Sequence, residues 1–219
     1  MVRERYTRQI GSLREDLLRL GSMAEQALLR AITSLETWDS VSAAQIISDD
    51  AQIDNAWRAL EERTVHLLAT QQPIVASDLR LITVVTAIAG ELERIGDYAN
   101  IIARRVRRAT RRPSLVNPPP AIKEMARLAI QMVNTSLEAF IRQDPALAHS
   151  LTQSDERVDE LEDQLRAEII ALVKADPDRV EAAIDMLDAI HALERAADRA
   201  TNIGERVIFL STNSVEPLN

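Results

Sequence analysis

One charged segment occurs twice in the chain, and this duplication limits the possible folds. The segment GELERIGDYANIIARRV (90–106) recurs in diverged form as HALERAADRATNIGERV (191–207). Both copies contain Leu-Glu-Arg, an Asp four residues after the Glu, and an Ala two residues further on. Apolar residues recur every seven positions through the first copy, at Leu81, Ile88, Ile95 and Ile102. This period predicts an amphipathic helix, and the duplication predicts two related helical halves.

Proline and turn residues divide each half into three predicted helices. These span residues 6–37, 39–70, 78–108, 121–142, 145–174 and 178–211. Asp144-Pro145 and Asp176-Pro177 are typical of an N-cap followed by Pro at the first helical position, and Asp78 is expected to cap the third helix. The Pro-dense segment RRPSLVNPPP (111–120) predicts a linker.

We therefore predict an all-α protein with six long helices in an up-down topology. Two tandem, sequence-related three-helix bundles are expected at residues 1–112 and 121–219, joined by a linker at 113–120. The low content of Gly and Pro, 5 and 8 of 219 residues, agrees with this fold class.

Composition excludes several functional classes. The chain has no Cys, so it lacks disulfides and thiolate metal sites and fits a reducing cytoplasm. Its N-terminus has no apolar signal-peptide core, and its longest apolar run, LITVVTAIAG (81–90), is too short to cross a bilayer. A net charge of −8 argues against nucleic acid as a partner. We expect a soluble, cytoplasmic protein that reaches membranes at most through its partners.

Alignment of the halves reveals a second repeated acidic pair. The segment DDAQIDNAW (49–57) aligns with SDERVDELE (154–162), so each half has two acid pairs with a spacing of four residues. Residues four apart share a helix face, and antiparallel helices joined by a short turn place residues equidistant from that turn at one height. Two outward-facing groups of carboxylates are therefore expected. They are Asp50, Asp54, Glu93 and Asp97 in the first half, and Asp155, Asp159, Glu194 and Asp198 in the second.

These acids allow two interpretations. Solvated acidic helix faces are ordinary in a chain with 34 Asp and Glu residues. However, like charges four residues apart destabilise a helix by about 0.2–0.5 kcal/mol, so eight acids retained in diverged halves call for a compensating interaction. A hard cation with oxygen ligands would provide it. From spacing alone, a solvated face and a metal site both remain open.

His191 is a further candidate ligand. It lies three residues before Glu194 on the same helix face, although Gly90 occupies the matching position in the first half. A solvated histidine is the structural alternative.

The run ARRVRRATRR (103–112) contains six Arg residues. It is a candidate contact for an acidic partner or an anionic membrane surface. The residues that would make this contact are Arg104, Arg105, Arg107 and Arg108. Their location at the end of a predicted helix, where the helix dipole favours cations, is a sufficient structural explanation.

At these motifs the chain resembles the PhoU family of bacterial phosphate-uptake regulators. The resemblance rests on QQPIVASDLRLI (71–82), LERIGDYA (92–99), LERAADRATNI (193–203) and the duplicated three-helix plan, and it covers nearly the whole chain. It implies that the eight acids, which match the family's acid-x-x-x-Asp motifs, bind iron, zinc or magnesium ions. Tyr98 and Arg199 stand where many members have His, so the resemblance leaves the metal and its number open.

The resemblance also implies a regulatory function without catalysis. Such a protein would be a cytoplasmic homodimer that acts with the ATPase of a phosphate ABC transporter and with a phosphate-sensing histidine kinase. It would be a negative regulator of uptake and kinase output when phosphate is plentiful.

Two enzymatic alternatives are less well supported by the residues. A carboxylate-cluster metallohydrolase would activate water with two metals, but ligands on exposed helix faces form no enclosed pocket, and no repeated His or Lys offers a general acid or base. A ferritin-like oxidase needs Glu-x-x-His motifs facing a bundle core, and the sequence has none. We predict a non-catalytic regulator, with the metallohydrolase as the alternative.

Overall fold

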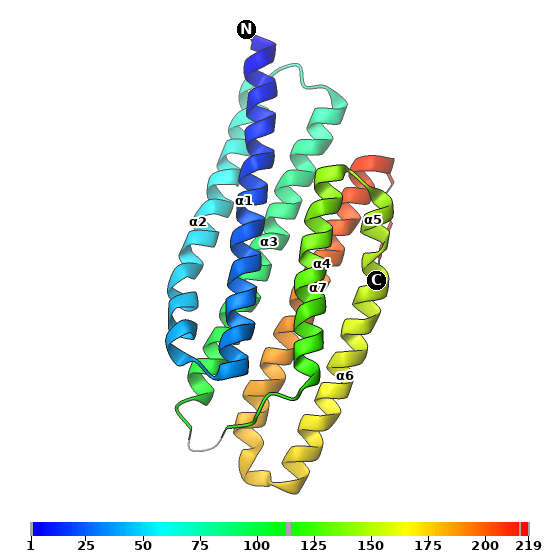
Figure 1. The fold of residues 1–219 in the computed structure, drawn as a ribbon. Coiled ribbons are helices and arrows are strands. Elements are labelled where there is room, and N and C mark those ends of the chain that lie inside the picture. The colour runs from blue at the N-terminus through cyan, green and yellow to red at the C-terminus, as the bar shows by residue number, and fades with distance from the viewer. Residues whose placement is uncertain (1, 113–114, 215, 219) are drawn as a thin grey trace.

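The computed structural model describes residues 2–112, 115–214 and 216–218 and contains no strand among them. The α-helices are α1 (Val2–Thr37), α2 (Ser40–Thr70), α3 (Ala76–Ala109), α4 (Ala121–Arg142), α5 (Pro145–His149), α6 (Leu151–Ala175) and α7 (Val180–Thr212), and a 3-10 turn, η1 (Pro177–Arg179), precedes α7. Figure 1 shows two helical bundles side by side, α1–α3 and α4–α7, and the short α5 precedes α6 in the second. The predicted all-α fold of two tandem bundles is confirmed.

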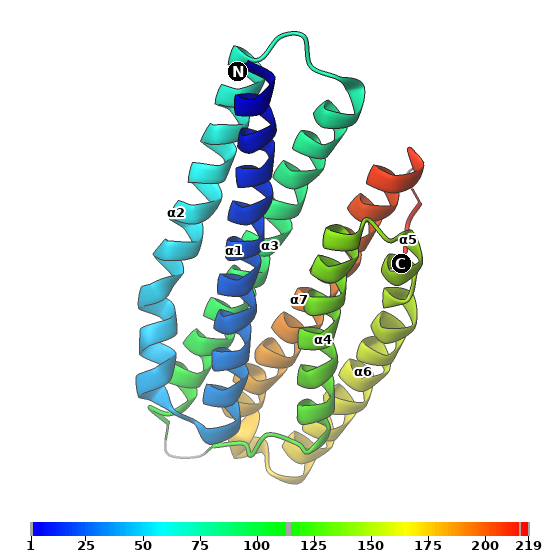
Figure 2. The same ribbon diagram turned by 45° about the horizontal axis from the view of Figure 1, so that its top comes forward.

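The two bundles meet along α3 and α7, the helices that carry the repeated segment. Arg199 Nη1 on α7 donates to Glu91 Oε2 on α3 at 3.3 Å. Arg105 Nε on α3 lies 3.1 Å from Asp188 Oδ2 on α7. These contacts show that the two helices run antiparallel. Accordingly, the α2–α3 turn lies at one end of the molecule and the α6–α7 turn at the other (Figures 1 and 2).

The predicted apolar stripe of α3 forms the centre of the core. Leu92, Ile95 and Ile102 are fully buried because α1, α2 and α7 all pack against α3. Burial of one such side chain stabilises the fold by about 1.5–3 kcal/mol. The stripe therefore fixes the rotation of α3, and with it the direction in which the acids of this helix project.

Of the two capping predictions for α5 and α3, that for Asp144 is confirmed and that for Asp78 is wrong, because α3 begins two residues before Asp78. Asp144 Oδ1 accepts hydrogen bonds from Ala146 N at 2.9 Å and Leu147 N at 3.2 Å, so it caps α5 as predicted. Asp78 lies in the first turn of α3, where its charge complements the helix dipole, and Val75 takes the capping position.

The second proline-marked start differs from the prediction. The Asp176 side chain caps no backbone group; its Oδ2 accepts from Arg179 Nε at 2.7 Å instead. Residues Pro177–Arg179 form the 3-10 turn, so α7 begins at Val180. Asp176 therefore occupies the N-cap position before Pro177, as predicted, but makes no side-chain cap bond because the nearby guanidinium occupies its carboxylate.

The helix predicted over residues 145–174 is divided at Ser150. Its hydroxyl donates to the Leu147 carbonyl at 2.7 Å, a local bond that competes with regular helix geometry. The short α5 therefore ends at His149 and α6 begins at Leu151.

The predicted linker at 113–120 lies between α3 and α4. Residues 113–114 lie outside the described residues, and Val116 is buried against the core. None of the helices in the described part of the chain combines the length and apolarity needed to span a bilayer.

Gly96 lets α2 and α3 approach closely beside the acids. A Cβ atom at Gly96 would lie 2.9 Å from Ile53 Cδ1 and 3.1 Å from Ile53 Cγ2, whereas one at Gly90 would meet no atom within 4 Å. Both glycines are inside α3. The structure thus offers a matched pair of helix-interior positions, one crowded and one open.

Gly96→Leu is expected to destabilise the protein by about 1–3 kcal/mol, because the added side chain forces α2 away from α3. Gly90→Leu should instead be neutral or stabilising by up to about 1 kcal/mol, because Leu has the higher helix propensity and the position is open. Urea unfolding followed by circular dichroism measures both. Equal effects at the two positions would contradict the close approach at Gly96.

Candidate metal centres

The first group of predicted acids is brought together on α2 and α3. Burial raises the pKa of Glu93, and the charges of Asp97, Asp54 and Asp50 raise it further. Burial also raises the pKa of Asp97, followed by the charges of Asp50 and Asp54. Each acid of α3 thus interacts with both acids of α2, which agrees with the predicted matching heights.

A polar chain supports one member of this group. Asn100 Nδ2 donates to Asp50 Oδ2, and Arg104 Nε donates to Asn100 Oδ1 at 2.9 Å. Burial raises the pKa of Asp50 despite this hydrogen bond, which acts in the opposite direction. Asp50 is therefore oriented by α3 but is not neutralised by a direct ion pair.

The second group lies on α6 and α7 and is more deeply buried. Asp155 is 6% exposed, and its Oδ1 has no hydrogen-bond partner. Burial, followed by the charges of Asp198 and Asp159, raises the pKa of Asp155 to about 6. Burial, Asp198 and Glu162 raise the pKa of Glu194 to about 7, although Arg195 acts in the opposite direction. These acids also interact as predicted, but the expectation that all of them face outward was wrong for Asp155, which is buried.

Glu162 is a ninth acid that the sequence analysis missed. It raises the pKa of both Glu194 and Asp159, so it belongs to the second group. Duplication was the criterion for the other eight acids, and Glu162 aligns with Trp57 in the first half. Its spacing on the helix face, three residues after Asp159, was the available signal.

His191 joins Glu162 and Glu194 in one compact group. His191 Nδ1 lies 3.2 Å from Glu162 Oε1 and 3.3 Å from Glu194 Oε2. One ligand atom from each of the three side chains lies within 4.8 Å of the other two. Over the residues that the structure describes, this is the one group of three His or acidic residues that meets this distance.

The eight predicted acids are therefore neighbours without forming a closed coordination sphere. Their charges shift one another's pKa, yet no three of their oxygens come within the same 4.8 Å in the described part of the chain. Mutual repulsion of carboxylates favours rotamers that separate the oxygens.

A model of the PhoU domain matches the chain twice, at residues 17–106 and 122–207. The chain belongs to the PhoU family. The phosphate-specific transport system accessory protein PhoU homolog of Clostridium acetobutylicum is 33% identical over 221 residues, covering 100% of both chains. Its counterpart in Escherichia coli K12 is 30% identical over 207 residues, covering 93% of this chain and 84% of that protein.

Solved PhoU structures share the whole fold. The crystal structure of PhoU from Pseudomonas aeruginosa has a TM-score of 0.90 and 32% identity and covers 95% of this chain and 100% of that chain. The phosphate transport system regulatory protein PhoU from Streptococcus pneumoniae has a TM-score of 0.88 and 29% identity, with 96% and 99% covered. The match therefore extends over both bundles.

The residues of the second centre in this PhoU-family chain fit a bound cation. Asp155 Oδ1 and Glu194 Oε2 are buried and have no hydrogen-bond partner. A buried unsatisfied polar atom costs about 1–3 kcal/mol, and a cation would offset that cost. Carboxylate oxygens suit magnesium, manganese or iron, and His191 adds a nitrogen ligand to the second centre.

The arginine run of α3 makes intramolecular ion pairs. Arg105, Arg108 and Arg112 surround Asp185 of α7, which is 1% exposed. Arg112 Nη2 is the nearest, 3.2 Å from Asp185 Oδ2. Burial raises the pKa of Asp185, and the three guanidinium groups oppose this change. Two of the four arginines predicted to bind a partner, Arg105 and Arg108, are thus engaged between the bundles.

Arg112→Ala is expected to destabilise the protein by about 2–3 kcal/mol, because it weakens the compensation of a buried carboxylate. Arg111→Ala, at the exposed neighbouring position, should change stability by less than about 0.5 kcal/mol. Thermal unfolding of the two variants makes the comparison. Similar losses in both would show that the ion pairs with Asp185 contribute little.

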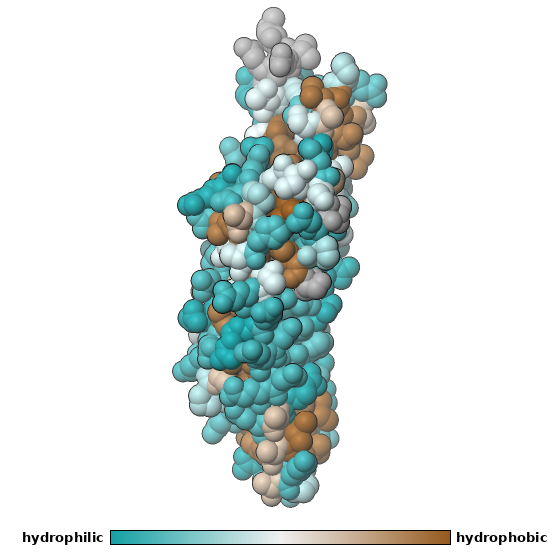
Figure 3. All heavy atoms as spheres, turned by 90° about the vertical axis from the view of Figure 1, so that its right-hand side faces the viewer, coloured by the Kyte–Doolittle hydropathy of each residue, from teal (hydrophilic) through white to brown (hydrophobic). Residues whose placement is uncertain are grey.

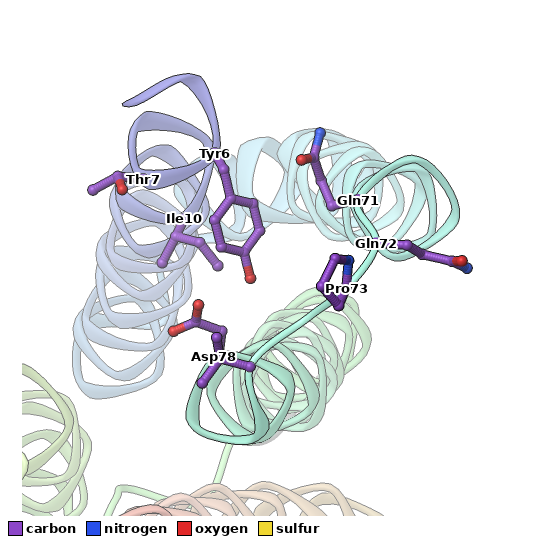
Figure 4. Close-up of a pocket in the computed structure, with 8 residues that line it drawn as sticks. Tyr6, Thr7, Ile10, Gln71, Gln72, Pro73 and Asp78 are labelled. Atoms are coloured by element: carbon purple, nitrogen blue, oxygen red, sulfur yellow. The ribbon is translucent and has the colours of Figure 1, made fainter. Parts of the chain in front are cut away.

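A large pocket lies at the α2–α3 turn, remote from the acids. It has a volume of about 670 Å³ and lies between α1 and the segment Gln71–Asp78. In Figure 4 the side chains of Tyr6 and Asp78 point toward each other, and burial followed by Asp78 raises the pKa of Tyr6. Asp97 lies 19 residues beyond Asp78 on α3, about 28 Å along the helix, so this pocket is separate from the metal centres.

A smaller apolar groove lies at the opposite end, beside the α6–α7 turn. Its lining includes Ile170, Val180 and Ile184, each more than two-fifths exposed. Figure 3 shows apolar surface at this lower end, below a hydrophilic middle section.

Proposed function

We propose that this chain is a non-catalytic, metal-binding negative regulator of phosphate uptake and phosphate signalling. In this proposal it acts between the ATPase of a phosphate ABC transporter and a phosphate-sensing histidine kinase, in the cytoplasm and as a homodimer. Membership of the PhoU family supports the phosphate assignment, since its relatives are named accessory proteins of phosphate-specific transport.

The observation that carries the metal assignment is the duplicated set of interacting carboxylates. Asp155 and Glu194 hold buried oxygens without hydrogen-bond partners, and the acids of each group raise one another's pKa. Iron, zinc and magnesium are the proposed ions. In the bound state the carboxylates would hold the ion, and the ion would join α2 to α3 and α6 to α7.

The positions of the acids support a regulatory assignment over hydrolysis. Asp97 and Asp159 are exposed, and neither adjoins a deep pocket. Such faces suit binding and cross-linking of helices better than the exclusion of water from a reacting bond. Arg104 and Arg107 make no ion pair among the described residues and remain candidates for contact with an acidic partner.

Affinity capture with the purified transporter ATPase, at high and low phosphate, tests the regulatory proposal. We expect the ATPase to be retained by the wild-type chain in a phosphate-dependent manner. Asp97→Ala with Asp198→Ala should reduce retention. The matched control is Glu61→Ala with Glu168→Ala, which removes the same charge from exposed positions of α2 and α6. No association at either phosphate level would refute the adaptor function.

Phosphatase turnover decides between this proposal and the metallohydrolase. We expect no turnover by the metal-loaded wild-type protein. Turnover that disappears in the Asp97→Ala, Asp198→Ala variant would replace the regulatory proposal with the hydrolase.

A further inference from the structure

We propose that Glu162, His191 and Glu194 form a nitrogen-containing site for a transition-metal ion of the Zn²⁺ class, and that the first half of the chain lacks its equivalent. This inference deepens the proposed function, because Glu194 also belongs to the second group of duplicated acids. The proposed site differs from the duplicated acid groups in its ligands, since neither Glu162 nor His191 is part of an acid-x-x-x-Asp motif.

Convergence of the three donors is the first argument. The Glu162 and Glu194 side chains are 15% and 13% exposed, so two nearly buried carboxylates face each other across α6 and α7. His191 Nδ1 lies within 3.3 Å of an oxygen of each. Arg166 Nη2 donates to Glu162 Oε1 at 2.8 Å, which orients this carboxylate and leaves Oε2 available to an ion.

Unpartnered oxygens in and beside the group are the second argument. Glu194 Oε2 is buried and accepts no hydrogen bond, even though His191 is close. Asp155, 94% buried, also has an unpartnered oxygen, and its charge interacts most strongly with Asp198, one helical turn after Glu194. Two buried carboxylate oxygens on α6 and α7 thus lack a hydrogen-bond partner.

Comparison of the two halves is the third argument. Trp57 occupies the position of Glu162, and Gly90 occupies the position of His191. The first centre therefore offers only oxygen ligands, which suit magnesium or manganese, whereas imidazole favours zinc, iron, copper or nickel. The two halves of one chain should consequently differ in metal selectivity.

His191 also gives the site access to solvent. Its side chain is 58% exposed, while the two carboxylates lie beneath it. Three protein ligands leave the fourth position of a tetrahedral zinc ion to water, as in open zinc sites. The bound ion should therefore exchange with the surrounding solution.

Titration of the metal-free full-length protein with Zn²⁺ in the presence of excess Mg²⁺ tests the site. The wild-type protein should retain one Zn²⁺ that Mg²⁺ does not displace. Glu162→Gln and His191→Ala should each weaken this binding at least tenfold and remove the visible absorption of a bound Co²⁺ substitute. His149→Ala is the matched control, because His149 is a half-exposed histidine paired with Glu216 away from the site.

Unchanged Zn²⁺ affinity in His191→Ala would overturn the inference and leave His191 as an ion-pair partner of the two glutamates. That result would leave the proposed function unaffected, because the proposed function depends on metal binding by the duplicated acids. In that event the double variant Asp97→Ala, Asp198→Ala would lose all metal binding, whereas His191→Ala would bind metal like the wild-type protein.

Transfer of the site to the first half is the converse experiment. The positions are Trp57 and Gly90, and a Cβ at Gly90 meets no atom within 4 Å. Trp57→Glu with Gly90→His should create a second Zn²⁺ equivalent that survives excess Mg²⁺. Gly90→His alone, which spares the half-buried Trp57, should bind the added ion more weakly. A folded double variant that binds only one Zn²⁺ would contradict the assigned ligand set.

Discussion

Chelator-treated protein is expected to lose about 4 kcal/mol of stability between pH 5 and pH 8. Asp155 and Glu194 have ordinary pKa values of 3.8 and 4.5, and burial with neighbouring acids raises these pKa values to about 6 and about 7 in the folded protein. The folded state therefore binds more protons than the unfolded state between about pH 4 and pH 7. The stability contributed by these groups is present at low pH and is lost as pH rises through the folded-state values.

Divalent cations should offset much of this loss of stability. An ion that binds only the folded, ionised carboxylates adds about 2.7 kcal/mol of stability when its concentration is 100 times its dissociation constant. Urea unfolding at pH 5, 6, 7 and 8, with chelator and with Mg²⁺ or Mn²⁺, measures both effects. A chelated protein whose stability is constant or rises over this range would show that the carboxylates are already compensated within the chain.

Asp155→Asn is expected to stabilise the metal-free protein by about 2 kcal/mol at pH 8 and to weaken cation binding. The substitution keeps the shape of a side chain that is 6% exposed and removes its uncompensated charge beside Asp198 and Asp159. An amide is also a poorer ligand than a carboxylate for a hard cation. A residue retained for binding at the expense of stability should show these opposite effects.

Glu168→Gln provides the control for Asp155→Asn. Glu168 is an exposed acid of the same helix, so its neutralisation should change stability by less than about 0.5 kcal/mol and leave metal binding intact. Denaturant unfolding at pH 8 and metal titration are the two measurements. Destabilisation by Asp155→Asn in the metal-free protein would show that the ionised carboxylate is a structural partner.

The features that sequence predicted well depend on helix periodicity. A helix has 3.6 residues per turn, so the sequence spacing places Leu92, Ile95 and Ile102 on one face and the acids of each pair on another. The burial of the apolar residues and the alignment of the acids could therefore be inferred. Counting residues from the α2–α3 turn also placed Asp50 beside Asp97, and the charges of these two residues do interact.

The features that sequence missed depend on contacts between distant elements. The ion pairs of Arg105 and Arg108 with α7 require the packing of one bundle on the other, which no local pattern specifies. Asp176 takes the N-cap position, but its carboxylate accepts from the Arg179 guanidinium and makes no cap bond to the backbone. Glu162 was missed because the search relied on duplication, and this acid exists in one half only.

The metal content of untagged protein tests the central claim most directly. Elemental analysis after purification, followed by titration with iron, zinc and magnesium, should find bound ions in the wild-type chain. The double variant Asp97→Ala, Asp198→Ala should lose most of these ions. Asp97 interacts with both acids of α2 in the first group, and Asp198 interacts with both duplicated acids of α6 in the second. Equal metal content in the wild-type and variant proteins would contradict the assignment of the duplicated carboxylates as metal ligands.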